Sequence, residues 1–160
     1  MLAKEIMTAT VISVTPDHSV RHAAQIMLDH HISGLPVIDD GGRLVGMLTE
    51  GDLLRRAELG SPAWTRGAQG SEDYIHTHSW RVGDVMTNSA ITADEDMSIG
   101  RLAAIMSAND IKRVPIMRDD KVVGIVSRAD ILRGIATAEQ DTTAPGDEAI
   151  RRAVAACLRE

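Results

Sequence analysis

The sequence predicts an α/β (α+β) protein made of two copies of one unit, each running strand, helix, strand, strand, helix. The first observation behind this prediction is that GMLTEGDLL, residues 46–54, recurs as GIVSRADIL, residues 124–132. The second is that EIMTATVISVTPDHSV, residues 5–20, matches DVMTNSAITADEDMSI, residues 84–99. A unit of about 50 residues buries too little apolar surface to be stable alone. We therefore expect the two copies to pack on each other around a pseudo-two-fold axis.

The order of elements within the unit follows from the spacing of apolar residues. Short apolar runs at residues 11–14 and 90–93 predict the first strands, and residues 35–48 and 114–126 each predict a β-hairpin around a polar turn. Between them, apolar side chains recur at helical spacing. These positions are Val20, Ala23, Ala24 and Met27 in the first copy and Ile99, Leu102, Ala103 and Met106 in the second. A second helix is expected where each hairpin ends.

The repeat divides the chain into four segments. We assign repeat 1 to residues 1–57, an inter-repeat linker to residues 58–80, repeat 2 to residues 81–135, and a linker with a C-terminal amphipathic helix to residues 136–160. The last helix is expected because apolar residues fall on one helical stripe, at Ile150, Val154, Cys157 and Leu158. An amphipathic helix needs an apolar partner, either on the two repeats or on a second subunit.

Composition and charge argue against several classes of protein. The 160 residues carry 23 acidic and 17 basic side chains spread along the chain, so the formal charge is −6 and no basic face is expected for nucleic acid. No apolar run approaches the roughly 18 residues that a membrane span requires, and Lys4 and Glu5 interrupt the region where a secretion signal would be apolar. A single cysteine, Cys157, cannot form an internal disulfide, which agrees with a reducing compartment. The expected localisation is cytoplasmic.

Neither a catalytic site nor a metal site is expected. The sequence contains no GxSxG nucleophile elbow, no GxxxxGKS/T phosphate loop and no HExxH zinc motif, and Cys157 has no identifiable base partner. His18 and His22 have a spacing that presents two imidazoles to one metal, but no carboxylate or thiol occupies an obvious third position. We therefore expect that the protein is not an enzyme.

The repeated Thr/Ser-x-x-Asp phrase has two interpretations. From Thr49 to Asp52 and from Ser127 to Asp130, a hydroxyl stands at a helix N-cap and a carboxylate follows three positions later, which is the pattern of a capping box. Alternatively the same groups bind a ligand, because the free N–H groups and positive dipole end of a helix N-terminus hold a phosphate. A carboxylate repels phosphate, so it would bind the hydroxyl groups of a ribose instead. Both interpretations stay open on these residues alone.

Two glycines add to the ligand interpretation. Gly46 and Gly124 each stand three residues before the hydroxyl residue of the phrase. We expect them to leave an open strand surface beside each site. Duplication would then place two such sites on one shared cleft.

The phrases quoted above, together with IMT, VMT, ISGLPVI and IKRVPIM, resemble a tandem pair of CBS domains, also called a Bateman module. The resemblance covers about residues 1–135. It implies a regulatory sensor that binds an adenosine-containing ligand in the cleft between the repeats, with AMP, ADP or ATP ahead of NAD and S-adenosylmethionine. It also implies a homodimer without catalysis. An unknown effector protein, or a further C-terminal domain, would read the change in conformation.

Transferred position by position, the resemblance implies two half-sites. Asp52 and Asp130 would bind the ribose hydroxyl groups, while Thr49 and Ser127 would reach the ribose or the phosphates. Each base would lie against the other repeat, where apolar walls with backbone amides suit a flat, weakly polar adenine. The base beside Ser127 is expected to meet Thr10, Ile12, Ile32 and Ser33, and the base beside Thr49 is expected to meet Ser89, Ile91, Ile111 and Lys112.

The two half-sites differ where phosphate would bind. The second copy has Lys112 and Arg113 where the first has Ser33 and Gly34, and Arg128 follows the second hydroxyl residue. Cations bind phosphate, and arginine can do so with two parallel hydrogen bonds. The half-site of the second copy is therefore expected to favour a charged nucleotide. The alternative is that these cations only form a solvated face.

Two further alternatives concern the tail and the function. The segment DEAIRRAVAACL at residues 147–158 resembles the first helix of a BON domain, a small domain linked to phospholipid binding. In that case the chain is the regulatory part of a longer protein. The alternative function is a ligand-free dimeric scaffold, in which both Thr/Ser-x-x-Asp phrases are only helix caps.

Overall fold

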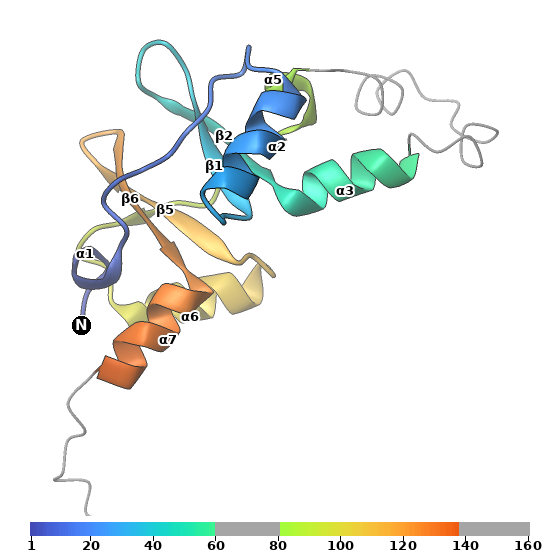
Figure 1. Ribbon diagram of the computed structural model, residues 1–160. Coiled ribbons are helices and arrows are strands. Elements are labelled where there is room, and N and C mark those ends of the chain that lie inside the picture. Colours follow the sequence, from blue (N-terminus) through green and yellow to red (C-terminus); the bar gives the residue numbers. More distant parts are fainter. Residues whose placement is uncertain (60–80, 138–160) are drawn as a thin grey trace, which may run out of the picture.

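Each repeat folds as a small sheet with two helices beside it, and the two helix pairs lie at opposite ends of the molecule (Figure 1). The computed structural model describes residues 1–59 and 81–137, so the expected C-terminal helix and most of the expected linker lie outside the described residues. Repeat 1 contains α2 (Val20–Asp29), β1 (Gly34–Ile38), β2 (Leu44–Thr49) and α3 (Glu50–Leu59). Repeat 2 contains β4 (Ala93–Asp94), α6 (Ile99–Ala108), β5 (Arg113–Arg118), β6 (Lys121–Ser127) and α7 (Arg128–Thr137). The predicted α+β architecture of two repeated units is confirmed.

Both hairpins form around the turns that the sequence predicted. Strands β1 and β2 pair antiparallel, as do β5 and β6. The second hairpin closes on Asp119 and Asp120, whose φ angles of 49° and 60° suit the twist of the flanking strands in a two-residue turn. The first turn has one residue more and uses Gly42, with a φ of 79°, while the Asp39 carboxylate accepts a hydrogen bond from Arg43 N–H at 2.9 Å.

The first strand of each unit is shorter than the apolar run that predicted it. In repeat 2 it is the two-residue β4, which pairs parallel with β5. In repeat 1 it is a single bridge, in which Val14 N–H donates to Pro36 O (3.1 Å) and Ile38 N–H donates to Val14 O (2.9 Å). Residues 10–12, just before this bridge, line a cavity between the repeats instead of pairing with a strand.

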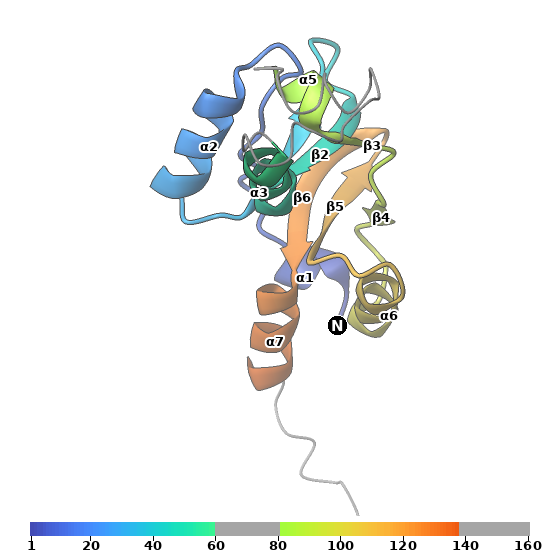
Figure 2. The ribbon, with the colours of Figure 1, turned by 90° about the vertical axis from the view of Figure 1, so that its right-hand side faces the viewer.

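The segments that precede the two repeats are exchanged between them. Residues 1–8, which include α1 (Ala3–Ile6), pack on repeat 2. Residues 81–88, which include α5 (Val82–Val85) and β3 (Thr87–Asn88), pack on repeat 1. Figure 2 shows the result, with α5 beside the helices of repeat 1 and α1 beside α7. The sequence did not predict the exchange, because swapping two similar segments leaves the repeat pattern unchanged.

The hydrogen bonds of the exchange are the same on both sides. Strand β3 pairs antiparallel with β2, where Thr87 lies opposite Met47. Thr8 lies opposite Ile125 at the equivalent place on β6, with Thr8 N–H donating to Ile125 O at 2.9 Å and Ile125 N–H donating to Thr8 O at 3.1 Å. Each crossing therefore ties one repeat to the other through the backbone.

The two hydrophobic cores depend on the same exchange. The core of repeat 1 buries Val82 and Val85 from the opposite segment, and the core of repeat 2 buries Ala3, with Ile6 and Met7 packed against it. The most deeply buried large side chains of the two cores are Leu35, Leu48, Leu102, Met106 and Ile116. Neither core is complete without the segment from the other repeat, so the pair forms one structural unit.

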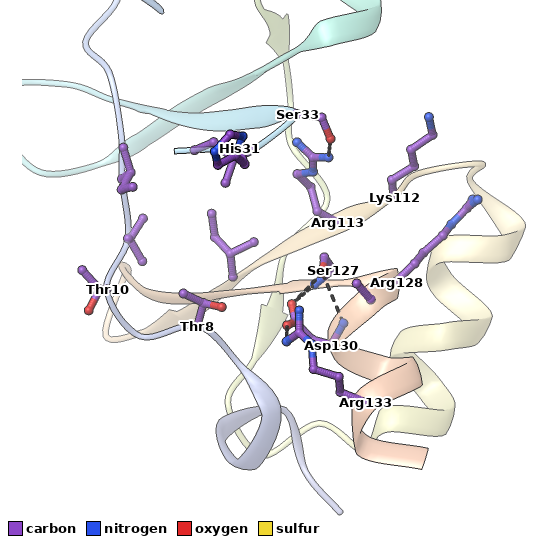
Figure 3. Close-up of a pocket in the computed structure, with 15 residues that line it drawn as sticks. Thr8, Thr10, His31, Ser33, Lys112, Arg113, Ser127, Arg128, Asp130 and Arg133 are labelled. Carbon is purple, nitrogen blue, oxygen red and sulfur yellow. Dashed lines mark hydrogen bonds and ion pairs between the residues drawn. The ribbon is translucent and has the colours of Figure 1, made fainter. Parts of the chain in front are cut away.

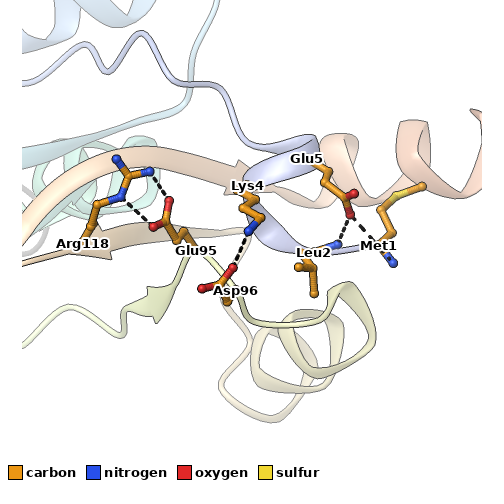
Figure 4. Close-up of polar contacts among 7 residues, drawn as sticks. All are labelled: Met1, Leu2, Lys4, Glu5, Glu95, Asp96 and Arg118. Carbon is orange, nitrogen blue, oxygen red and sulfur yellow. Dashed lines mark hydrogen bonds and ion pairs between the residues drawn. The ribbon is translucent and has the colours of Figure 1, made fainter.

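Polar contacts add to the placement of the N-terminal segment (Figure 4). Lys4 N–H donates to Glu95 O at 2.9 Å, and Lys4 Nζ donates to Asp96 Oδ1 at 2.6 Å, which raises the pKa of Lys4. Arg118 donates to both oxygens of the Glu95 carboxylate, and this interaction lowers the pKa of Glu95. Because ion pairs at the surface contribute little to stability, the buried apolar contacts and backbone bonds fix the segment.

The exchanged segments explain the two glycines of the repeated phrase. Gly46 on β2 and Gly124 on β6 are buried, and a Cβ atom at Gly46 would lie 2.6 Å from Thr87 O and 2.8 Å from Met86 Sδ. Met7 covers Gly124 in the same way. The prediction that these glycines leave an open strand surface was wrong, because the exchanged segment crosses the strand at that point. Only a residue without a side chain permits so close a crossing.

Gly46→Ala is expected to destabilise the fold by about 1–3 kcal/mol, because the added methyl group meets a backbone carbonyl of the crossing segment. Gly100→Ala is the control. Gly100 is exposed on α6, its Cβ would meet nothing within 4 Å, and alanine favours a helix over glycine by about 0.5–1 kcal/mol. Urea-unfolding midpoints measure both changes. An unchanged midpoint for Gly46→Ala would contradict the close crossing.

Candidate functional site

Two cavities lie in the cleft between the repeats. The first, of about 450 Å³, lies where the start of α7 faces residues of repeat 1, and we call it the Ser127 cavity (Figure 3). The second, of about 340 Å³, lies where the start of α3 faces residues of repeat 2, and we call it the Thr49 cavity. Each cavity thus combines the beginning of a helix from one repeat with a wall from the other.

Every residue predicted for the site lines at least one of these cavities. The Ser127 cavity contains Thr10, Ile12, Ile32, Ser33, Lys112, Arg113, Ser127, Arg128 and Asp130. The Thr49 cavity contains Thr49, Asp52, Ser89, Ile91 and Ile111, and again Ser33, Lys112 and Arg113. The structure therefore brings together the groups that the sequence assigned to each half-site, across the boundary between the repeats.

The capping box of α7 is complete and buried. Ser127 N–H and Ser127 Oγ–H both donate to Asp130 Oδ2 at 2.7 Å, and Asp130 N–H donates to Ser127 Oγ at 3.3 Å. Asp130 is 5% exposed, and its other oxygen, Oδ1, accepts a hydrogen bond from Arg133 Nη1 at 2.5 Å. A carboxylate oxygen has two acceptor positions, so Oδ1 keeps the capacity for one further donor.

The capping box of α3 has the same geometry. Thr49 N–H and Thr49 Oγ1–H donate to Asp52 Oδ2 at 2.8 Å and 2.9 Å. Among the described residues, the contact of Asp52 Oδ1 is a long one, 3.5 Å from Thr87 Oγ1. In both copies the cap occupies Oδ2 and leaves acceptor capacity on Oδ1. The cap and ligand interpretations are therefore compatible, because they use different atoms of one carboxylate.

Among the described residues, sequence reasoning missed seven polar residues of the cavities: Thr8, His31 and Arg133 in the Ser127 cavity, and Glu50, Arg55, Thr87 and Asp110 in the Thr49 cavity. Arg133 lines the Ser127 cavity and Arg55 lines the Thr49 cavity, each three positions after the aspartate and one turn further along its helix. The signal was available, since the DLLR and DILR stretches repeat this arginine. Thr8 and Thr87 also line the Ser127 and Thr49 cavities, respectively. Their positions depend on the exchanged segments and had no signal in the sequence.

One wall is common to both cavities. Ser33, Lys112 and Arg113 line each of them. Arg113 reaches from β5 to repeat 1, where it donates a hydrogen bond to Ser33 Oγ, and a Cβ atom at Gly34 would lie 2.9 Å from Arg113 Cζ. Burial lowers the pKa of the Arg113 guanidinium, and the charge of Glu50 opposes that change. The arginine of repeat 2 thus lies against the glycine at the equivalent position of repeat 1, and this contact separates the two cavities.

Within residues 1–59 and 81–137, no three His, Cys, Asp or Glu residues are grouped so that they could hold a metal ion. The rings of His18 and His22 lie 4.8 Å apart, and His18 Nδ1 accepts a hydrogen bond from Thr15 N–H at 3.1 Å. In the same part of the chain, no helix has the length and apolar character that crossing a membrane requires.

A duplicated α+β unit with exchanged segments and a shared cleft defines a class of paired regulatory modules. The model of the CBS domain matches residues 3–58 and 82–137, and the chain belongs to the CBS domain family as a tandem pair. The CBS pair is a regulatory module, and the domain itself carries no catalysis.

The chain is similar to segments of longer proteins and to solved structures of CBS domain pairs. The inosine-5'-monophosphate dehydrogenase of Methanocaldococcus jannaschii is 33% identical over 132 residues, which cover 82% of this chain and 23% of that enzyme. The chain spans only 31% of another matched protein from that organism. The crystal structure of CBSX2 in complex with AMP is 26% identical, with a TM-score of 0.76, and the match covers 87% of this chain and 99% of that chain. The CBS domain pair of protein MJ0100, in complex with 5'-methylthioadenosine and S-adenosyl-L-methionine, is 30% identical, with a TM-score of 0.69 and coverage of 87% and 98%.

Ser127→Ala is expected to lower the free energy of unfolding by about 0.5–2 kcal/mol without any ligand, because it removes the acceptor for Asp130 N–H. Thr137→Ala is the control. The Thr137 hydroxyl donates to Arg133 O at the exposed end of the same helix, so its loss should change stability by less than about 0.5 kcal/mol. Thermal unfolding of both variants measures the difference, and equal effects would contradict the capping role.

Proposed function

We propose that the protein is a sensor that binds an adenosine-containing ligand in the cleft between its two CBS repeats and transmits a change in conformation to a partner. AMP, ADP and ATP are the preferred candidates, ahead of NAD and S-adenosylmethionine. One observation carries the proposal: each cavity joins the hydroxyl and carboxylate of a helix start in one repeat to an apolar wall of the other. The presence of AMP or S-adenosyl-L-methionine in solved CBS pairs supports this class of ligand.

The chemistry of the cavities suits the parts of a nucleoside. In the Ser127 cavity the ribose hydroxyl groups would donate to Asp130, and the base would lie against Ile12 and Ile32. In the Thr49 cavity Asp52 would take the ribose, and Ile91 and Ile111 would contact the base. Because the cap already holds both carboxylates, little side-chain entropy is lost when the ligand binds.

The proposed transmission of a conformational change depends on the fact that each cavity is lined by residues of both repeats. A ligand in either cavity contacts both repeats, so it favours one angle between them when its affinity differs between the two arrangements. The proposed receiver is an effector protein or a further C-terminal domain. The BON resemblance of residues 147–158 lies outside the described residues. The proposed compartment is the cytoplasm.

A thermal-shift screen with AMP, ADP, ATP, NAD and S-adenosylmethionine tests the proposal. A ligand at a hundred times its dissociation constant stabilises the folded protein by about 2.7 kcal/mol, which raises the melting temperature. We expect Asp130→Ala or Asp52→Ala to abolish this increase for the ligand of its own cavity, while Asp40→Ala, in the exposed β1–β2 turn, should leave it unchanged. If no ligand shifts the melting temperature, the scaffold alternative is favoured, and the two cavity substitutions should cost only about 0.5–2 kcal/mol as lost caps.

We propose further that the module is a homodimer through the outer faces of its helices. Four apolar side chains on these faces are between 60% and 68% exposed, namely Leu28, Leu54, Leu132 and Ile135. Leu54 on α3 and Leu132 on α7 occupy equivalent positions, so both helix pairs carry exposed apolar groups. Large apolar residues gathered on a surface are typical of a protein interface.

The dimer is tested by light scattering after size-exclusion chromatography. Wild type should have twice the mass of one chain, and Leu132→Glu should shift it toward one chain, because a charge would be buried in the interface. Lys121→Glu, at the exposed start of β6, is the control and should remain a dimer. A monomeric wild type would contradict the proposal, and a dimer that survives Leu132→Glu would place the interface elsewhere.

A further inference from the structure

The duplication provides an internal comparison of the two cavities, because each residue has an equivalent in the other repeat. The hydroxyl, the aspartate and the following arginine are the same in both: Ser127, Asp130 and Arg133 correspond to Thr49, Asp52 and Arg55. Two other equivalent positions differ in charge. Arg128 and His31 line the Ser127 cavity, where Glu50 and Asp110 line the Thr49 cavity.

The Ser127 cavity has an excess of positive charge. Its cations gather on the α7 side, opposite Thr8 and Thr10 (Figure 3). Among the residues that the structure describes, its charged side chains are the cations Lys112, Arg113, Arg128 and Arg133 and the carboxylate of Asp130. Asp130 is neutralised by Arg133 at 2.5 Å, so the net charge of these groups is positive. Backbone N–H groups at the start of α7 add to the positive field.

One of these cations, Arg128, has only weak partners. Its Nε donates to Ile111 O at 3.2 Å, and its Nη2 lies 3.4 Å from Asp110 Oδ1. The Asp110 side chain is fully exposed, and an ion pair in that environment contributes little. Arg128 therefore loses little when it turns to a phosphate in the cavity.

The Thr49 cavity has balanced charges. Among the described residues, its carboxylates are Glu50, Asp52 and Asp110, and its cations are Arg55, Lys112 and Arg113. Lys112 Nζ lies 4.0 Å from Glu50 Oε1, so this shared cation already has a carboxylate partner on the Thr49 side. A phosphate entering here would meet Glu50 at the helix start, where the other cavity offers Arg128.

We propose that the two cavities take different classes of ligand: the Ser127 cavity takes an adenine nucleotide with phosphates, and the Thr49 cavity takes an adenosine derivative without phosphate. This inference rests on the proposed function and adds the ligand class of each cavity. The residues that select the ligand are Arg128 and Glu50, which occupy the first position of α7 and α3. Both side chains are about half exposed, so their exchange for the opposite charge should preserve the fold.

Isothermal titration with ATP and adenosine tests this division, since the two probes differ only in the phosphates. Wild type should bind one ATP per chain, and ATP-saturated protein should still bind one adenosine. Arg128→Glu should weaken ATP binding by at least about tenfold, because one charge-assisted hydrogen bond is replaced by repulsion. Glu50→Arg should give a second ATP site. Lys121→Glu changes the net charge as much as Arg128→Glu does, but lies outside both cavities, and should leave the binding of ATP unchanged.

The outcomes separate this inference from the proposed function. If wild type binds two ATP molecules, or if Asp52→Ala and not Asp130→Ala removes the single ATP site, the division is wrong and the sensor proposal stands. If neither ATP nor adenosine binds wild type, the division is wrong, and the sensor proposal is wrong as well only when NAD and S-adenosylmethionine also fail in the thermal-shift screen. Circular dichroism and the unfolding midpoint of each variant show whether a loss of binding reflects loss of the fold. Glu50→Arg is expected to gain an ATP site, and an unfolded protein could not produce that result.

Discussion

The crossing of one chain segment over a buried glycine in each repeat holds the cleft together. Gly46 and Gly124 let residues 81–88 and 1–8 cross β2 and β6, and each crossing segment completes the core of the opposite repeat. The crossings also bring Thr87 and Thr8 to the cavities. Since both ties run through backbone bonds and buried side chains, the repeats cannot separate as independent domains. The angle between the repeats can therefore change only by a small rotation.

The Thr/Ser-x-x-Asp phrase serves the helix and the cavity with different atoms. In each copy Oδ2 of the aspartate closes the capping box, and Oδ1 faces Arg133 at 2.5 Å or Thr87 at 3.5 Å. The cap fixes the carboxylate before any ligand arrives, which is the arrangement that lowers the entropic cost of binding. A residue pattern that stabilises a helix start therefore also holds a carboxylate with acceptor capacity at the wall of a cavity.

Local chemistry was sufficient for most of the elements and for the walls of the cavities. Ser19 and Ser98 cap α2 and α6, turn residues close the hairpins, and the paired motifs place residues such as Ile12 and Ile91 in the cleft. The exchange of segments was not predictable, because a two-fold pattern does not say which copy packs on which repeat. The first strand of repeat 1 was overestimated because Val11 and Ile12, which belong to the apolar run, line a cavity instead of pairing with a strand.

The partition between the cavities shows why a duplicated site does not stay symmetric. Near a pseudo-two-fold axis, a side chain approaches the position of its own equivalent, so two large residues compete for one space. Gly34 and Arg113 are such equivalents, and a Cβ atom at Gly34 would already lie 2.9 Å from the guanidinium carbon. The glycine of repeat 1 leaves room for the arginine of repeat 2, and a side chain at Gly34 would displace the guanidinium group. The shared wall around Arg113 is therefore not symmetric, and the two cavities beside it differ in electrostatic potential. Arg128 in the Ser127 cavity and Glu50 in the Thr49 cavity occupy equivalent positions with opposite charge, which adds to this difference. Two different pockets are thus a consequence of close packing at the axis of a duplicated fold.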